Sequence, residues 1–310
     1  LESIGLDDVG SGFSIALSMA AVRSLSLNNP YRFFDKKANI FPYPLSNIIG
    51  GGAHSGYITE QELLVIPVNS KNAAEAVRTN ISIWNEVGKK LRKCISGMNR
   101  ECAWMCNMED LKALDVLTDI AKSHGARIGI DFAANSFYDE KSNRYVYKSP
   151  VRWLAAGEQL DFVMDLIKTY NLAYVEDPFH ENDFHNFANL TKKAKCIVTG
   201  DDLFVTNASR LSIGIKKKAG NAIIIKPNQA GTISRIMKAV NLAKKARYST
   251  IVSHRSCETN DTFISDLALG IGSALIKVGA HGMDELKLNR LVDLWNDSEK
   301  PRMAKISHVI

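Results

Sequence analysis

Six titratable residues stand at the ends of apolar runs in the part of the sequence that follows residue 126. They are Asp131, Glu176, Asp201, Lys226, His254 and Lys277. Three carboxylates that lie close together repel one another unless a cation joins them, and a ligand set of oxygen atoms alone favours a hard ion such as Mg²⁺. The first three residues of the series therefore predict a Mg²⁺ site.

The residues that follow predict a binding site for an anionic substrate. A carboxylate or a phosphate would suit the group formed by Lys226, His254, Arg255, Ser256 and Lys277. A metal ion on one side and a lysine on the other can remove a proton next to a carboxylate, provided that a neighbouring cation lowers the pKa of the lysine. The alternative for Lys226 is a strand-end lysine that only extends to solvent.

These residues can meet only in a fold that brings strand ends together, and the hydrophobic pattern indicates such a fold. From residue 126 onward, short apolar runs alternate with helical patterns over residues 156–170, 183–194, 208–219 and 232–246. This alternation implies βα units and a parallel sheet. In a doubly wound sheet only the strands beside the switch point face the ligand, whereas in a barrel all strand ends meet at one mouth. Because every run ends on a titratable group, we expect an α/β fold of the TIM-type βα barrel class.

Several motifs, in this order and at these separations, resemble the enolase family in its archaeal form. They are "GGAHSGYITEQEL" (51–63), "RIGIDFAANSFYD" (127–139), "VEDPF" (175–179), "GDDLFVTN" (200–207), "IIKPNQAGT" (224–232), "VSHRSCETNDTF" (252–263) and "IKVGA" (276–280). The resemblance covers nearly the whole chain. It implies a Mg²⁺-dependent lyase of glycolysis and gluconeogenesis, a phosphopyruvate hydratase that reversibly dehydrates 2-phosphoglycerate to phosphoenolpyruvate.

The resemblance also implies roles for individual residues. The Mg²⁺ ligands would be Asp131, Glu176 and Asp201. Lys226 would take the proton from C2, and Glu62 and Glu101 would assist departure of the C3 hydroxyl. The substrate-binding residues would be His54 in a closing loop, Arg255 and Ser256 at the phosphate, Lys277 at the carboxylate, and His254 beside them.

Two stretches depart from the family pattern. The family holds its catalytic acid in a Gly-Asp-Glu-Gly turn, but the matching stretch here reads "NRECAWMCN" (99–107), so Glu101 lacks its flanking glycines. A surface glutamate before a helix that begins near Asp110 is the alternative. In the loop before His54, Gly50 stands where the family usually has Asn.

The resemblance divides the chain into two parts. Residues 1–40, with a helical pattern over 7–27, are expected to be a remnant of the family's N-terminal domain, and residues 41–310 the catalytic barrel. In the family that domain carries a mobile loop with a serine ligand for a second Mg²⁺, which this sequence is not expected to provide. An enolase-like binding or scaffold module with little or no activity therefore stays open, as does another dehydratase of the superfamily.

Composition narrows the class of protein further. The formal charge of +6 comes from short basic runs in helical patterns, with no interleaved aromatic residues, so solvated helix faces are expected and nucleic acid is a weak alternative. The apolar stretches are too short to span a membrane. Five irregularly spaced cysteines and the lack of a signal-peptide pattern favour a cytoplasmic protein. Since enolases usually form dimers, a homo-oligomer is possible.

Overall fold

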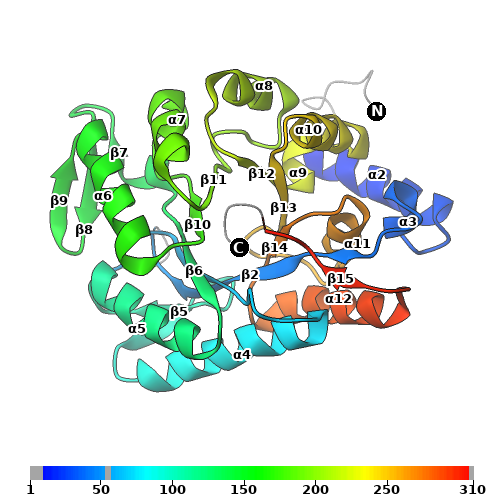
Figure 1. Ribbon diagram of the computed structural model, residues 1–310, viewed down its shortest axis with the longest axis horizontal. Helices are drawn as coiled ribbons and strands as arrows, with labels where there is room; N and C mark the ends of the chain where they lie inside the picture. The colour runs from blue at the N-terminus through cyan, green and yellow to red at the C-terminus, as the bar shows by residue number, and fades with distance from the viewer. Residues whose placement is uncertain (1–9, 53–56, 307–310) are drawn as a thin grey trace.

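Eight strands form a barrel in the part of the chain that the structure describes, residues 10–52 and 57–306 of a computed structural model (Figure 1). Their order around the barrel is β11, β10, β6, β3, β2, β14, β13 and β12. The two end strands meet, because Asn221 N donates to Val198 O at 2.9 Å. The expected TIM-type barrel is therefore confirmed, with a nearly closed sheet.

The strands of this barrel are short. Their bounds are β2 Tyr43–Gly50, β3 Glu62–Ile66, β6 Arg127–Asp131, β10 Tyr174–Glu176, β11 Ile197–Thr199, β12 Ala222–Ile225, β13 Ser249–Ser253 and β14 Leu275–Lys277. The neighbouring strands that follow residue 126 pair in parallel, as expected. Only β3, among these eight strands, runs antiparallel to both of its neighbours, β2 and β6. Its first residue, Glu62, is therefore the one that lies at the C-terminal ends of the other strands.

Side chains alternate along each strand between the barrel interior and the helical layer. In β12, Ala222 and Ile224 belong to the interior apolar cluster, whereas Ile223 and Ile225 pack toward the helices. Because the period is two residues, the next inward position after Ile224 is Lys226. Three other chemically active side chains follow the same rule in the top layer of the interior: Glu176 after Tyr174, Lys277 after Leu275, and Glu62 before Leu64.

The helices surround the barrel where the apolar spacing predicts them (Figure 1). Several begin at a polar cap: the side chains of Asn72, Asp183, Asn207 and Thr232 accept backbone N–H groups of the first turns of α4, α7, α8 and α10. The bounds are α2 Ser11–Leu25, α3 Tyr31–Phe34, α4 Ala73–Lys90, α5 Asp110–Ser123, α6 Ala156–Tyr170, α7 Phe184–Lys193, α8 Ala208–Lys217, α9 Pro227–Ala230, α10 Ile233–Lys245, α11 Phe263–Gly270 and α12 Glu285–Asp297.

Smaller elements complete the fold. The hairpin of β4 (Ile95–Met98) and β5 (Trp104–Cys106) attaches to the end of β2, and its tip carries Glu101. A separate sheet of β7 (Tyr138–Asp139), β8 (Arg144–Lys148) and β9 (Val151–Leu154) lies beside α6. Two 3₁₀ turns, η2 (Ala134–Phe137) and η3 (Gly282–Asp284), follow barrel strands. Near the ends of the described chain, β1 (Ile40–Phe41) pairs with β15 (Arg302–Met303).

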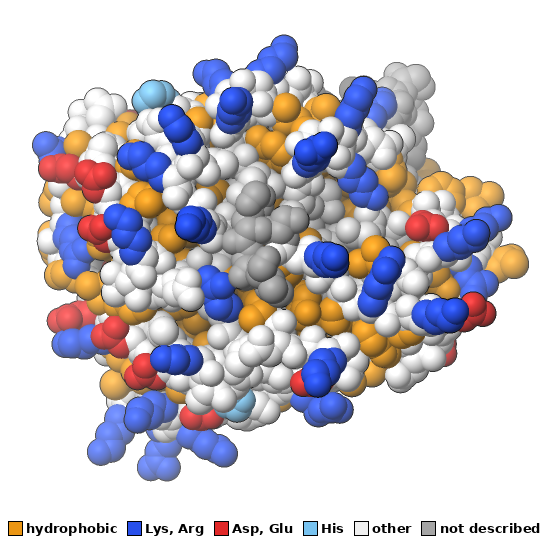
Figure 2. Space-filling model, viewed as in Figure 1, with side chains coloured by type: hydrophobic (Ala, Val, Ile, Leu, Met, Phe, Trp, Pro, Cys, Tyr) orange, Lys and Arg blue, Asp and Glu red, His pale blue; other side chains and the backbone are white. Residues whose placement is uncertain are grey.

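The basic runs lie at helix ends, as expected for solvated faces. Lysines occupy the last turns of α4, α7, α8 and α10, where positive charge stabilises the exposed carbonyl groups. Figure 2 shows Lys and Arg side chains spread over the viewed face rather than collected in one groove. None of the helices in the described ranges is long and apolar enough to cross a membrane.

The loop that leads into β3 is anchored by one buried acid, Asp110, and contains a second, Glu60. Asp110, at the start of α5, accepts Thr59 N at 3.0 Å, and Glu60 beside it is fully buried. Burial and the neighbouring Asp110 carboxyl raise the pKa of Glu60 well above its ordinary value of 4.5. Glu60 is therefore protonated in the folded chain at pH values where it ionises in the unfolded chain.

This difference predicts that Glu60→Gln stabilises the protein at neutral and alkaline pH. Below pH 4.5 the folded and the unfolded states of the parent both carry the proton, so ionisation of Glu60 does not change the free energy of unfolding there. Above pH 4.5, the unfolded state binds fewer protons than the folded state. The free energy of unfolding therefore falls as pH rises, by up to about 1.4 kcal/mol per pH unit. Urea unfolding at acid and alkaline pH should show the variant's advantage growing with pH. The exposed Glu140→Gln is the control, and an advantage independent of pH would contradict the assignment.

Candidate active site

A polar cavity of about 200 Å³ opens at the C-terminal ends of the barrel strands. Its lining includes both acidic and basic side chains, which the strand ends deliver to one place. Among the residues expected from the sequence, those on the wall are Glu62, Glu101, Asp131, Glu176, Asp201, Lys226, His254, Arg255, Ser256 and Lys277. His54 lies outside the described residues.

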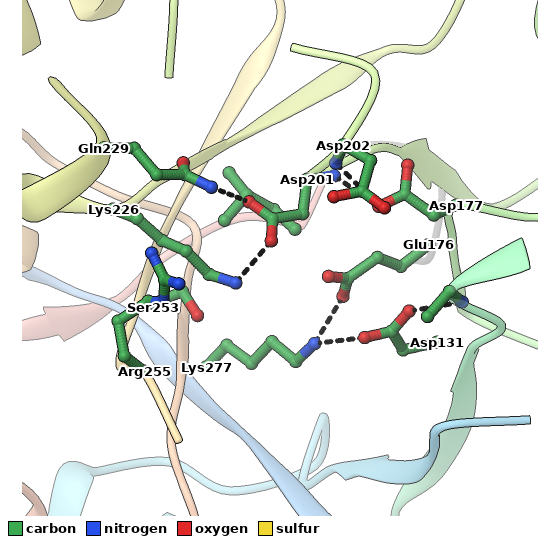
Figure 3. Close-up of polar contacts among 12 residues, drawn as sticks. Asp131, Glu176, Asp177, Asp201, Asp202, Lys226, Gln229, Ser253, Arg255 and Lys277 are labelled. Carbon is green, nitrogen blue, oxygen red and sulfur yellow. Dashed lines mark hydrogen bonds and ion pairs between the residues drawn. The ribbon is translucent and has the colours of Figure 1, made fainter. Parts of the chain in front are cut away.

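Lys277 is the centre of one half of the cavity (Figure 3). Its Nζ atom lies 2.8 Å from Asp131 Oδ2, 2.7 Å from Glu176 Oε2 and 2.9 Å from Glu62 Oε2. The side chain is only 2% exposed. Burial alone would lower the pKa of Lys277, but the carboxylates of Asp131 and Glu176 outweigh burial and raise it well above 10.5. The sequence predicts the lysines on the side of the cavity opposite the carboxylates, but Lys277 is in direct contact with them.

Lys226 and Asp201 form the other half. Lys226 Nζ lies 2.5 Å from Asp201 Oδ2, and Gln229 Nε2 donates to Asp201 Oδ1 at 2.8 Å (Figure 3). Burial lowers the pKa of Lys226, yet the Asp201 charge outweighs burial, and the net direction is upward. The expectation that a neighbouring cation lowers this pKa is therefore wrong for this arrangement: Lys277 acts in that direction, but the Asp201 charge has the larger effect.

Glu62 and Glu101 have opposite pKa shifts within the same cavity. Burial and the Glu101 carboxylate raise the pKa of Glu62 well above its ordinary value. Burial would also raise the pKa of Glu101, but His254 and hydrogen bonds from Ser256 and Asn47 lower it to about 2. Ser256 Oγ donates to one Glu101 oxygen at 2.6 Å, and Asn47 Nδ2 to the other at 2.9 Å. At a pH between the two pKa values, Glu62 therefore carries a proton and Glu101 is ionised.

The segment after β13 supplies the polar groups on the remaining side. His254 is buried and lies 2.6 Å from Asp284 Oδ2 through Nδ1, which fixes its ring. Arg255 is exposed, and its Nη1 donates to Asn228 Oδ1 at 3.3 Å, so its guanidinium lies at the rim. This long contact leaves Arg255 able to turn toward an anion in the cavity.

The donor chemistry fits a hard divalent cation, which the family implies. Asp131, Glu176 and Asp201 offer only oxygen atoms, and burial together with the Asp131 charge raises the pKa of Glu176 to about 7. Carboxyl groups so crowded are stabilised by added positive charge, which the two lysines supply in this arrangement. Within the described residues, no three His, Cys, Asp or Glu side chains are already arranged around a metal position.

Four polar residues of the site are not singled out by the sequence reasoning. Asn47, with Ser46 beside it, is polar in a fully buried strand, β2, and this could have marked it. Asp177 follows Glu176 and accepts the backbone N–H groups of residues 201 and 202 at 2.8 and 2.9 Å. Gln229 orients the Asp201 carboxylate, and Asp284 orients His254 from a turn that no strand-end pattern predicts.

Comparisons with known proteins agree with this geometry. The model of the family "Enolase, C-terminal TIM barrel domain" matches residues 38–299. An enolase of Methanosphaera stadtmanae is 39% identical over 317 residues, covering 96% of this chain and 77% of that protein. An enolase of Archaeoglobus fulgidus is 39% identical with the same coverage, and one of Picrophilus torridus is 35% identical over 92% of this chain and 74% of its own length.

Proposed function

Since the chain belongs to the enolase family, we propose that its barrel mouth catalyses the reversible dehydration of 2-phosphoglycerate to phosphoenolpyruvate, the lyase reaction of phosphopyruvate hydratase. The observation that carries this proposal is one polar cavity that brings together three carboxyl groups (Asp131, Glu176 and Asp201), two lysines and the Glu62–Glu101 pair. Removing a proton next to a carboxylate and then expelling a hydroxyl group requires these functions in one place.

Lys226 is the proposed base for the C2 proton. Its partly buried amino group lies in the cavity, just after the C-terminal end of β12. Among the ion pairs of the described site, Lys226 pairs with one carboxylate, Asp201, whereas Lys277 pairs with three. With its pKa raised by Asp201, Lys226 is an acid in this arrangement. The role of base therefore requires that the Asp201 charge be directed away from the amino group.

Glu62 and Glu101 are proposed to act on the C3 hydroxyl. Two carboxyl groups whose surroundings shift their pKa values in opposite directions can divide an acid role and a charged role between them. The proton that a departing hydroxide needs is therefore assigned to Glu62, and not to Glu101 as the family pattern implies, because the pKa of Glu62 is raised and that of Glu101 is lowered. Glu101, fixed by Asn47 and Ser256, presents a carboxylate that orients the hydroxyl group.

Binding of the substrate anion is assigned to the basic and polar rim. Arg255 and Ser256 would take the phosphate, Lys277 the carboxylate, and His254 lies beside them. A guanidinium group can bind phosphate through two parallel hydrogen bonds. His54 is proposed to belong to the closing loop by the family pattern alone.

Mg²⁺ is the proposed cation, held by Asp131, Glu176 and Asp201. When bound, it would supply positive charge that stabilises the negative charge developing on the substrate carboxylate. Residues 1–40 are proposed to belong to the N-terminal domain of the family and residues 41–310 to form the catalytic domain. A cytoplasmic location and a homo-oligomer are also proposed, on the usual behaviour of the family.

Asp201→Asn should weaken Mg²⁺ binding, because the change removes one of three anions that the cation neutralises. The loss should exceed the roughly tenfold effect of removing an outer partner of a metal ligand. Isothermal titration calorimetry measures it, with Asp202→Asn as the matched control, since Asp202 is bound to Asn135. Equal Mg²⁺ affinity in Asp201→Asn and the parent would exclude Asp201 from the metal site.

A direct test of the function is formation of phosphoenolpyruvate from 2-phosphoglycerate, followed by absorbance with Mg²⁺ present and after chelation. We expect turnover that disappears with the chelator and returns with added Mg²⁺. Binding of the substrate without any turnover would instead favour the binding or scaffold module considered from the sequence.

A further inference from the structure

The turn that presents Glu101 is closed by one side chain, Asn99. Its Oδ1 atom accepts hydrogen bonds from Glu101 N at 3.0 Å and from Ala103 N at 2.9 Å. Its backbone closes the same turn, because Asn99 N donates to Ala103 O at 2.9 Å and Cys102 N donates to Asn99 O at 3.0 Å. Four hydrogen bonds that define the loop from residue 99 to 103 thus involve Asn99.

This turn needs such support because its backbone is unfavourable. Cys102 adopts φ of 58°, in the left-handed region that glycine occupies readily and other residues do not. The far side of the turn is held by Trp84, whose Nε1 atom donates to Cys102 O at 2.8 Å. Asn99 and Trp84 therefore do, through side chains, what flanking glycines would do through backbone freedom.

The space that Asn99 fills exists because residue 50 is glycine. A Cβ atom built on Gly50 would overlap Asn99 Nδ2 and lie 3.1 Å from Asn99 Cγ. The φ angle of Gly50 is not in the left-handed region, so its backbone would accept alanine. Glycine is therefore needed at position 50 because a larger residue would clash with Asn99, and not because the backbone conformation excludes other residues.

We propose that Asn99 is a positioning residue for Glu101, and that Gly50 and Asn99 act as a unit in which the amide of Asn99 packs over Gly50 and fixes the turn. The inference rests on the proposed function, since it assigns Glu101 to the loss of the hydroxyl group. It explains how Glu101 reaches the cavity although the sequence around it lacks glycines. Positioning of Glu101 affects the second step of the reaction and leaves Lys226, on another strand, in place.

The test measures proton removal and loss of the hydroxyl group separately in the variant Asn99→Ala, which lacks the accepting Oδ1 atom. Exchange of the C2 proton with deuterated solvent reports proton removal, and phosphoenolpyruvate formation reports the complete reaction. We expect kcat for dehydration to fall roughly 10- to 100-fold, while KM and the exchange rate stay near those of the parent. Asn99→Asp keeps an accepting oxygen and should retain most of the turnover. Asn107→Ala, an exposed asparagine after the same hairpin, is the matched control.

Gly50→Ala provides an independent variant with the Asn99 side chain intact. Its methyl group should displace the amide of Asn99 and reproduce the selective loss of dehydration. The double variant Gly50→Ala, Asn99→Ala should be no slower than the slower single variant, because both changes break the same hydrogen bonds. If Asn99→Ala does not fold, Gly50→Ala decides by the same measurements.

Parent-like dehydration in Asn99→Ala or in Gly50→Ala would overturn the proposal. So would an equal fall of exchange and dehydration, since that would mean that Asn99 supports the whole mouth rather than Glu101. A parent protein that does not form phosphoenolpyruvate at all would contradict the proposed function instead, so the two failures are distinguishable.

Discussion

Lys226→Ala is expected to abolish exchange of the C2 proton of 2-phosphoglycerate with deuterated solvent. A general base contributes about 10²- to 10⁴-fold to proton removal, and alanine leaves no group within reach to replace it. The melting temperature should fall less than in the Lys277 variant described below, because Lys226 pairs with one carboxylate, Asp201, and both side chains are partly exposed. NMR of the substrate in deuterated buffer with Mg²⁺ measures the exchange directly.

The control for this prediction is Lys195→Ala, which removes an exposed lysine just before β11. It should exchange the proton at the parent's rate. If Lys226→Ala also exchanged at that rate, Lys226 would be a strand-end lysine without a catalytic role. A parent that exchanges the proton but does not dehydrate would place the defect at Glu101, not at Lys226.

Lys277→Met is expected to destabilise the metal-free protein by about 3–5 kcal/mol, as does removal of one partner from a buried ion pair. Lys277 contacts three buried carboxyl groups, and without it the charges of Asp131 and Glu176 would be uncompensated. Urea unfolding in the presence of a chelator at pH 8 measures the loss. Added Mg²⁺ should reduce the loss, because the cation would neutralise Asp131 and Glu176 in place of the ammonium group.

The loss should also become smaller as the pH falls. A carboxyl group with a raised pKa takes up its proton early, and that of Glu176 is already about 7 with Lys277 present. Protonation removes the uncompensated charge, so the deficit at pH 5 should be smaller than at pH 8.

Lys287→Met is a matched control because Lys287 is equally buried, with Asp284 3.2 Å away. It should also lower stability, but Mg²⁺ should not restore it, since its partners do not line the three-carboxylate half of the cavity. Equal stability of Lys277→Met and the parent at pH 8 would show that the ammonium group does not compensate the carboxylates.

The strand-end pattern predicts the fold well because burial has a simple period. Apolar residues at alternate positions must face the barrel interior, so Glu176 and Lys277 follow Tyr174 and Leu275 into the same space. The direction of β3 could not be obtained in this way, because alternation looks the same in both directions. The position of Glu62 at the mouth therefore depended on the family resemblance, and the antiparallel pairing now gives its physical basis.

The electrostatics of the site were less predictable than its members. Residue types predict that carboxylates and lysines share the mouth, but a pKa depends on distances of a few ångströms. Lys226 was expected to have a lowered pKa, and its contact with Asp201 reverses the direction. The role of Asn99 was not predictable for the same reason. It depends on the close approach of the Asn99 amide to Gly50, which cannot be read from the sequence.

The pairing of β2 with β14, and of β1 with β15, has a consequence for synthesis on the ribosome. The first barrel strand ends at residue 50, and its second neighbour begins at residue 275. At common rates of translation, roughly 10 to 45 seconds separate their appearance. During this time one edge of β2, a strand that is buried throughout in the finished barrel, stays unpaired and open to association with other nascent chains. Chaperones that shield extended apolar segments should therefore engage the N-terminal third of this chain for longer than its last third.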